Sequence, residues 1–121
     1  MGKNTIQVLG TPYSVVGTTC DKDPKLAEAD GYSDWTTKEI VYDDTDGTDV
    51  ACLKNFSNFK KTVIRHEIVH CFLCESGLNS CSDWARNEEM VDFFAFQLEK
   101  IYKACKDAGA LEEVNDNEGS N

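Results

Sequence analysis

The spacing of apolar residues divides the chain into a first part with strand-like patterns and a second part with helical ones. In the second part, apolar side chains recur at intervals of three and four, which places them on one face of a helix. The first such set comprises Phe56, Phe59, Val63, Ile64, Ile68, Val69, Phe72 and Leu73. It predicts a helix that starts between residues 55 and 58 and ends near Gly77, because glycine favours the position just after a helix.

A second long helix is predicted after a short loop at residues 78–81. Ser82 or Asp83 can cap its start, it runs to about Asp107, and Gly109 stops it. Its apolar stripe consists of Val91, Phe94, Ala95, Leu98 and Ile101. The short connection makes the two helices an antiparallel pair.

The first part of the chain holds four segments with the alternation or β-branched content of strands. They are residues 5–9, 13–16, 31–35 and 39–42. A glycine and a proline separate the first two, which therefore predict a hairpin, and residues 25–29 can form a short helical turn. We expect a small antiparallel sheet of three or four strands packed on the two helices, which is an α+β fold.

Composition fits one globular domain over residues 1–110. The chain has 121 residues, of which 40% are hydrophobic. Residues 111–121 carry four acids and no base, so we expect a disordered tail. Residues 43–49 are also acidic, but they lack the final glutamate of a calcium loop and predict a surface turn.

Charge and cysteine content limit the classes of function. The formal net charge of −10 disfavours direct binding of nucleic acid, which needs a basic surface. No apolar run is long enough to cross a membrane. The chain has six cysteines and no apolar segment typical of a signal peptide near its start, so we expect free thiols and a cytoplasmic location.

Candidate chemistry is concentrated in the first helix, at His66-Glu67-Ile68-Val69-His70. Residues four apart lie one turn apart on the same helical face, so the two imidazoles can bind one Zn²⁺. Glu67 lies beside them and can take a proton from a metal-bound water. The chain contains two histidines, and both belong to this H-E-x-x-H pattern.

A catalytic zinc site needs a third protein ligand and an open position for water. Glu88 is the expected third ligand, with Glu89 as its rival, and Asp92 lies one turn further along the same face. We expect Asp92 to accept a hydrogen bond from one imidazole, that of His66. The alternative is that these acids only complement the helix dipole.

Cys71 and Cys74 form a C-x-x-C pattern directly after the histidine motif. Cysteine commonly fills apolar space as a small side chain. A second metal or redox site would need a partner motif or another histidine, and the chain has neither. We therefore interpret both cysteines as packing residues.

The H-E-x-x-H pattern, followed eighteen residues later by E-x-x-x-D, resembles the gluzincin branch of zinc metallopeptidases. The layout over residues 31–105 is similar to that of minimal ImmA/IrrE-type members and of small proteins from phages and prophages of Gram-positive bacteria. The resemblance implies a minimal zincin-like α+β fold, a catalytic zinc, a bacterial host cell, and a peptide substrate lying antiparallel to an edge strand. That edge would be residues 39–42.

The sequence thus predicts a zinc-dependent peptide-bond hydrolase acting on a specific protein, with Glu67 as the base. Larger gluzincins add a histidine or tyrosine that stabilises the oxyanion. Here Tyr32, Tyr42 or a backbone N–H would have to serve. The alternative is a zinc-stabilised accessory or interaction module with little activity, and a third possibility is a helical hairpin without metal.

Overall fold

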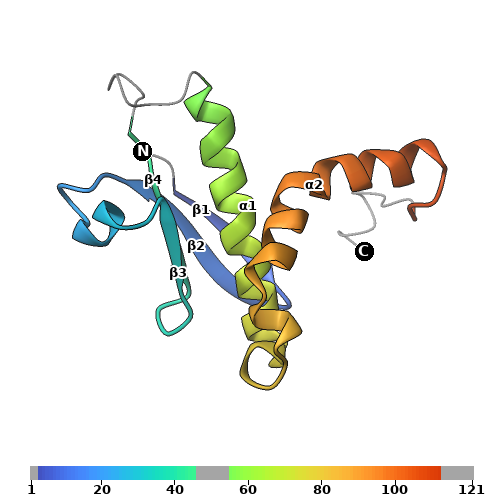
Figure 1. The fold of residues 1–121 in the computed structure, drawn as a ribbon, viewed down its shortest axis with the longest axis horizontal. Helices are drawn as coiled ribbons and strands as arrows, with labels where there is room; N and C mark the ends of the chain where they lie inside the picture. The colour runs from blue at the N-terminus through green and yellow to red at the C-terminus, as the bar shows by residue number, and fades with distance from the viewer. Residues whose placement is uncertain (1–2, 46–54, 113–121) are drawn as a thin grey trace, which may run out of the picture.

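The computed structural model describes residues 3–45 and 55–112, which form a four-stranded mixed sheet packed against two long helices (Figure 1). The strands are β1 (Lys3–Val8), β2 (Thr11–Thr18), β3 (Gly31–Asp34) and β4 (Glu39–Asp43). The helices are α1 (Phe56–Glu75) and α2 (Glu88–Asp107), and the 3-10 helices are η1 (Pro24–Ala27), η2 (Leu78–Ser80) and η3 (Trp84–Arg86). The predicted α+β class is confirmed.

The strand order is β1-β2-β4-β3, and this order corrects two expectations. β1 pairs with β2 and β3 with β4 in antiparallel hairpins, but β2 and β4 are parallel, so the sheet is not purely antiparallel. After β2 the chain passes through η1 and forms β3. β4 then lies between β2 and β3 and pairs with both. The edge strand on this side is therefore β3, and β4, expected at residues 39–42 to be the edge, is interior.

The core lies between one face of the sheet and α1. Its buried members come from three strands and the helix, and they are Val8, Tyr13, Val15, Ile40 and Cys71. A second cluster of Leu73, Ala85 and Val91 joins α1 to α2. β3 approaches α1 closely, because a Cβ atom added to Gly31 would lie 2.7 Å from a methyl carbon of Val63. A bulkier residue there would push the edge strand away from the helix.

The helix ends agree with the sequence at α1 and differ from it at α2. Asn55 caps α1, and Gly77 adopts a left-handed conformation with φ of 84°. The expected cap of α2 at Ser82 or Asp83 is wrong. The side chain of Asn87 caps this helix by accepting the N–H of Met90, whereas residues 84–86 form η3 and the carboxylate of Asp83 pairs with Arg86.

α2 changes direction near its middle, and its second half projects from the body of the molecule (Figure 1). At the bend, Nε of Arg65 donates to the carbonyl oxygen of Ala95 at 2.7 Å, and another guanidinium nitrogen pairs with Glu99 at 2.9 Å. A side chain that enters the helical hydrogen-bond ladder is a known cause of bending. The predicted stripe therefore faces the core only in the first half, since Leu98 and Ile101 are 43% and 39% exposed.

Two acidic segments lie mostly outside the described residues. They are the turn expected at residues 43–49, beyond Thr45, and the tail expected at residues 111–121, beyond Glu112. In the described part of the chain, no helix is both long and apolar enough to cross a membrane.

Glu75, the last residue of α1, ties the helix to both hairpins. Its carboxylate accepts hydrogen bonds from the ammonium of Lys38 and the hydroxyl of Tyr13, each at 2.7 Å, and from Thr11 at 3.3 Å. The Lys38 contact, followed by that of Tyr13, lowers the pKa of Glu75 below its ordinary value. The ionised carboxylate therefore stabilises the folded state, and this contribution is lost as the pH falls through the lowered pKa.

We expect Glu75→Gln to lower the melting temperature at pH 7 by several degrees. As the pH falls through the lowered pKa of Glu75, the difference from the wild type should shrink, because protonation then removes the same charge from the wild-type carboxylate. Thermal unfolding followed by circular dichroism between pH 7 and pH 3 measures both effects. Glu28→Gln, at an exposed acid, is the control; an equal loss in both variants would contradict this role of Glu75.

Candidate metal centre

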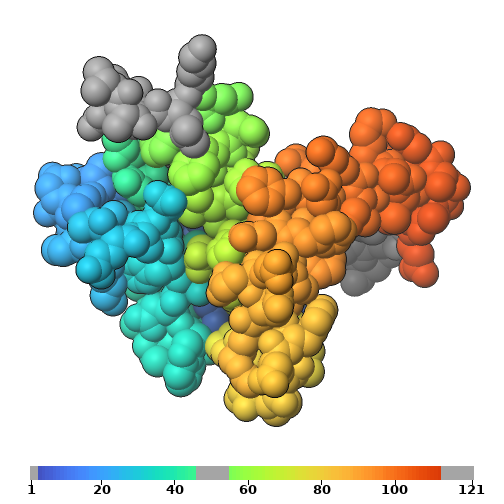
Figure 2. All heavy atoms as spheres, viewed as in Figure 1, coloured from blue at the N-terminus to red at the C-terminus, as the bar shows by residue number. Residues whose placement is uncertain are grey.

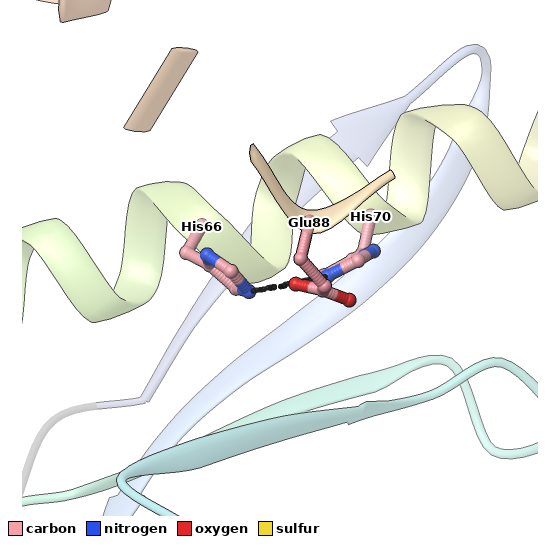
Figure 3. Close-up of side chains that lie close together, drawn as sticks. All are labelled: His66, His70 and Glu88. Carbon is pink, nitrogen blue, oxygen red and sulfur yellow. Dashed lines mark hydrogen bonds and ion pairs between the residues drawn. The ribbon is translucent and has the colours of Figure 1, made fainter. Parts of the chain in front are cut away.

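α1 places His66 and His70 one turn apart on the side that faces β3 (Figure 3). Their Nε2 atoms lie 3.1 Å apart, and their ring centroids lie 4.8 Å apart. Both rings are partly exposed, so solvent and small ligands can reach them. The four-residue spacing in the sequence thus places the two ring nitrogens close together on one face of the helix.

Glu88, the first residue of α2, completes a group of three atoms that could serve as metal ligands. Its Oε1 atom lies 3.3 Å from Nε2 of His66 and 3.3 Å from Nε2 of His70. Asn87 caps α2 immediately before it and so fixes where this first residue sits. The structure does not bring Glu89 into the group, so of the two predicted rivals it is Glu88 that joins the histidines.

The three interatomic distances suit a small cation. In a tetrahedron with zinc–ligand bonds of roughly 2.0–2.1 Å, neighbouring ligand atoms lie about 3.3–3.4 Å apart. The observed edges are 3.1, 3.3 and 3.3 Å. The group of His66, His70 and Glu88 could therefore hold a metal ion, and Glu88 approaches it from the side opposite the sheet (Figure 3).

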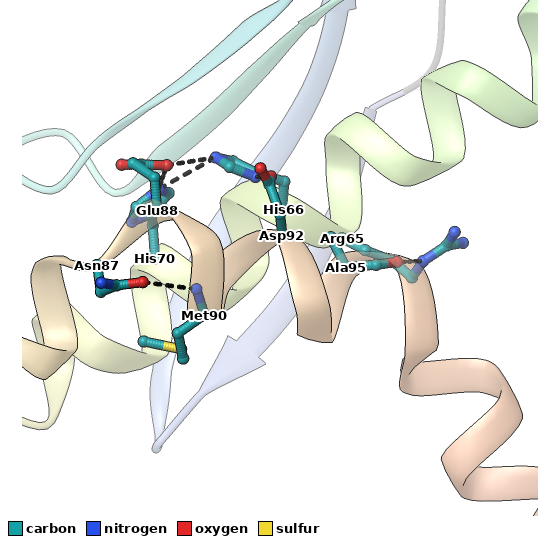
Figure 4. A network of polar contacts seen from close by, with 8 residues as sticks. All are labelled: Arg65, His66, His70, Asn87, Glu88, Met90, Asp92 and Ala95. Carbon is teal, nitrogen blue, oxygen red and sulfur yellow. Dashed lines mark hydrogen bonds and ion pairs between the residues drawn. The ribbon is translucent and has the colours of Figure 1, made fainter.

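Asp92 lies within hydrogen-bonding distance of the first histidine. It lies one turn after Glu88, and its Oδ1 atom is 2.9 Å from Nδ1 of His66 (Figure 4). When Nδ1–H donates a hydrogen bond to Asp92, Nε2 of His66 presents a lone pair toward His70 and Glu88. Such hydrogen bonds from carboxylates fix the tautomer of histidines that bind metals. The structure thus brings Asp92 to the position that the sequence predicted for it.

Glu67 lies beside the three-residue group but is not part of it. Its side chain is 8% exposed, and it lines a hollow on each side of the group. No described residue forms a hydrogen bond or ion pair with its carboxylate. A carboxylate that is nearly buried and lacks such a partner is free to accept a proton from a molecule bound in either hollow.

The cysteines of the C-x-x-C pattern take no part in the group of three. Cys71 is 2% exposed within the core, and burial raises the pKa of its thiol to about 12. It therefore stays protonated at neutral pH, whereas a metal ligand must be a thiolate. Among residues 3–45 and 55–112, no cysteine joins a cluster able to hold a metal ion.

Two hollows flank the group, and Gly31 of β3 lines both. We call the first the tryptophan-side hollow; it separates the β3–β4 turn from the start of α2 (Figure 2). Besides Gly31 and the group itself, it is lined by Tyr13, Tyr32, Ser33, Trp35, Glu67, Cys71, Cys74 and Asn79. We call the second the phenylalanine-side hollow; it is lined by Ala29, Asp30, Phe59, Thr62, Val63 and Phe96, together with His66, Glu67 and Asp92.

The two tyrosines proposed as oxyanion donors occupy different positions. Tyr42 packs against the core cluster and lines neither hollow. Tyr32 lines the tryptophan-side hollow, but its hydroxyl bonds to Asp23. Burial, reinforced by this bond, raises the pKa of Tyr32 to about 12. Its proton is therefore engaged away from the three-residue group.

Sequence reasoning missed the aromatic residues of the hollows. The sequence predicts Phe59 as part of the apolar face of the first helix and Trp35 as part of a strand, and it leaves Phe96 outside the predicted stripe. Phe96 follows Asp92 by four residues, and this spacing indicates that the two side chains share the face of α2 that also carries Glu88. The exposure of Trp35 has no signal in the sequence, because it depends on which strand forms the edge.

Comparisons of the chain with protein-family models, with curated proteins and with solved structures find no significant match. Function is therefore inferred from the residues of the site. Two imidazole nitrogens and one carboxylate oxygen form a donor set that suits zinc and other divalent transition metals.

Proposed function

We propose that this protein is a zinc-dependent peptide hydrolase. The observation that carries the proposal is the near-tetrahedral spacing of the ligand atoms of His66, His70 and Glu88, with the carboxylate of Glu67 beside them. When bound, zinc would lower the pKa of a water to about 7 and polarise a carbonyl. Three protein ligands leave a tetrahedral ion one position for that water.

The chain's own residues then supply the proton transfers. Glu67 would take the proton of the attacking water and pass it to the amine that leaves as the peptide bond breaks. Its position supports this role, because Glu67 lines both hollows next to the histidines. Asp92 would keep Nε2 of His66 available by holding the proton on Nδ1.

The resemblance to gluzincins agrees with this proposal. The H-E-x-x-H pattern lies on α1 and the E-x-x-x-D pattern follows on α2. These two helices bring His66, His70 and Glu88 together. In a minimal zincin-like arrangement the substrate would lie along an edge strand, and that strand would be β3. Gly31, Tyr32 and Ser33 of this edge strand line the tryptophan-side hollow.

A second candidate is a zinc-stabilised interaction module with little activity. It is favoured by large apolar side chains on the surface away from the site. Phe72, Trp84, Phe93 and Leu98 are all exposed. It is also favoured by the engagement of both tyrosine hydroxyls of the tryptophan-side hollow, because Tyr32 donates to Asp23 and Tyr13 donates to Glu75.

A cleavage assay tests the proposal. The protein is stripped of metal with a chelator, reloaded with one equivalent of zinc, and incubated with a complex peptide mixture that is then analysed by mass spectrometry. We expect new cleavage products only after reloading. If the zinc-loaded protein releases no product from any peptide, while it still binds one zinc, the interaction module replaces the hydrolase.

Asp92→Ala is expected to weaken zinc binding by about 10–100-fold, the usual effect of removing a hydrogen-bond acceptor from a metal-bound histidine. The group of three stays intact, so binding should not be abolished. Competition with a chromophoric zinc chelator measures the affinity. Asp107→Ala, at an exposed acid further along α2, is the control; equal affinity of Asp92→Ala and wild type would show that Asp92 does not orient His66.

A further inference from the structure

We infer that two copies of this chain associate through an apolar groove between α1 and α2, and that the projecting half of α2 of each copy packs into the groove of the other. This half comprises residues 96–107, and we call it the arm. The inference goes beyond the proposed hydrolase function and does not depend on it. The residues that line the groove include none of His66, His70 and Glu88, so association leaves the metal group open.

The residues that line the groove are all apolar. α1, η3 and α2 contribute to it, and its volume is about 310 Å³; its members include Ile68, Phe72, Trp84, Phe94 and Leu98. Phe72 and Trp84 are 40% and 54% exposed, so the groove opens to solvent. A contiguous exposed apolar patch of this kind commonly marks a surface that another molecule covers.

The arm continues the apolar stripe of α2 beyond the groove. Leu98 lines the groove, and Ile101 and Tyr102 follow it at spacings of three and four, on the same helical face. These two side chains are 39% and 59% exposed, and the arm projects from the body of the molecule (Figure 1). A helix of about three turns is only marginally stable in water unless its apolar face is packed. The arm therefore lacks a packing partner within the described part of its own chain.

The groove and the arm meet at Leu98, so one surface offers both a hollow and a projecting helix. Figure 2 shows the arm extending sideways from α1 and the sheet. A two-fold axis brings the same patch of two copies face to face. In that arrangement the arm of each copy enters the groove of the other, and both apolar surfaces leave water together.

The exposed apolar area agrees with what a stable dimer needs. Five side chains of the groove and the arm are 39–59% exposed, namely Phe72, Trp84, Leu98, Ile101 and Tyr102. If a whole large side chain offers roughly 150–250 Å², these five expose roughly 350–600 Å² per chain. A standard interface buries about 800 Å² per partner, of which somewhat more than half is apolar. The five side chains thus supply most of the apolar part of such an interface.

Charge on the arm suits an acidic partner such as a second copy. Lysines outnumber acids by three to two in residues 96–107, whereas the whole chain has a net charge of −10. Both acids of the arm are paired within the chain, Glu99 with Arg65 and Asp107 with Lys103. A basic arm that enters the groove of an acidic chain brings opposite charges together and lowers the repulsion between the two copies.

Sedimentation equilibrium of the full chain tests the inference. We expect the mass of two chains at about 100 μM, because interfaces of this size have micromolar or lower dissociation constants. Ile101→Glu places a charge within the interface and should raise the dissociation constant by about 100-fold or more. Phe93→Glu, at an exposed ring of α2 that does not line the groove, is the control and should associate like the wild type. Circular dichroism checks that both variants fold.

A photoreactive benzoylphenylalanine in place of Tyr102 identifies what the arm contacts. Isotopically labelled and unlabelled chains are mixed, so a crosslink between copies joins one peptide of each kind. Crosslinks from the arm to the peptides of Phe72 or Trp84 in the other copy support the inference. A monomer at every concentration up to about 100 μM would overturn it. Equal loss of association in both glutamate variants would do the same, as would a monomer in which the arm crosslinks to its own residues 113–121.

Discussion

Glu67→Gln is expected to lower the rate of peptide cleavage by about 10²–10⁴-fold, the usual contribution of a general base. Glutamine has nearly the same shape but cannot accept the water's proton. Since Glu67 is not one of the three residues that could hold the metal, zinc content and melting temperature should stay close to those of the wild type. Single-turnover cleavage rates and metal analysis of both proteins provide the measurement.

The same variant should capture substrates that the wild type cleaves. Proteins bound to immobilised Glu67→Gln from a host lysate are identified and then incubated with zinc-loaded wild type. Glu39→Gln, at an acid on β4 that lines neither hollow, serves as the control and should cleave at the wild-type rate. Wild-type cleavage rates in Glu67→Gln would contradict the role of this residue.

Glu88→Ala is expected to weaken zinc binding more than the roughly 10–100-fold loss expected at Asp92. It removes one of the three proposed ligand atoms and leaves two imidazoles, which is too few for a stable catalytic site. The side chain is largely exposed, so the fold should lose little stability. Competition with a chromophoric chelator gives the affinity, and circular dichroism checks the fold.

Glu89→Ala is the matched control, because it is an acid of the same length at the next position of α2. It should bind zinc like the wild type. If Glu89→Ala loses zinc and Glu88→Ala does not, the helical register at the start of α2 is shifted by one residue from the one described above. If neither loses zinc, the metal binds elsewhere and the proposed site is wrong.

Local rules were enough to predict the helices. The apolar spacing located α1 correctly, and Gly77 ended it in the left-handed conformation that favours glycine. The same rules misplaced the cap of α2, because Asp83 is drawn into an ion pair with Arg86 and Asn87 takes the cap. Several residues in this stretch can cap a helix, and the sequence does not say which of them is otherwise engaged.

The pairing of the sheet depends on contacts between residues far apart in the chain. Alternating side chains predict a strand but not the direction of its neighbour, so the parallel pair of β2 and β4 was missed. The bend in α2 was missed for a similar reason. At the bend, Arg65, thirty residues earlier in the chain, donates a hydrogen bond to the carbonyl oxygen of Ala95, and no local pattern indicates this contact.

The group of His66, His70 and Glu88 also combines contacts that are local in the sequence with contacts between distant residues. His66 and His70 needed only a helix to bring them together, so their spacing was sufficient. Glu88 and Asp92 share a face of α2 by the same rule. Their approach to the histidines, however, depends on the path of the connection through η2 and η3, which sets where α2 begins relative to α1. The hollows could not be predicted, because residues of β3, α1 and α2 form them jointly.

X-ray absorption at the zinc edge of the zinc-loaded protein tests the central claim most directly. With one zinc per chain, we expect nitrogen and oxygen ligands at about 2.0–2.1 Å, with the outer scattering of two imidazoles and no sulfur. Cys71→Ala combined with Cys74→Ala should leave the spectrum unchanged. Sulfur at about 2.3 Å, or a spectrum without imidazole scattering, would contradict a zinc site formed by His66, His70 and Glu88.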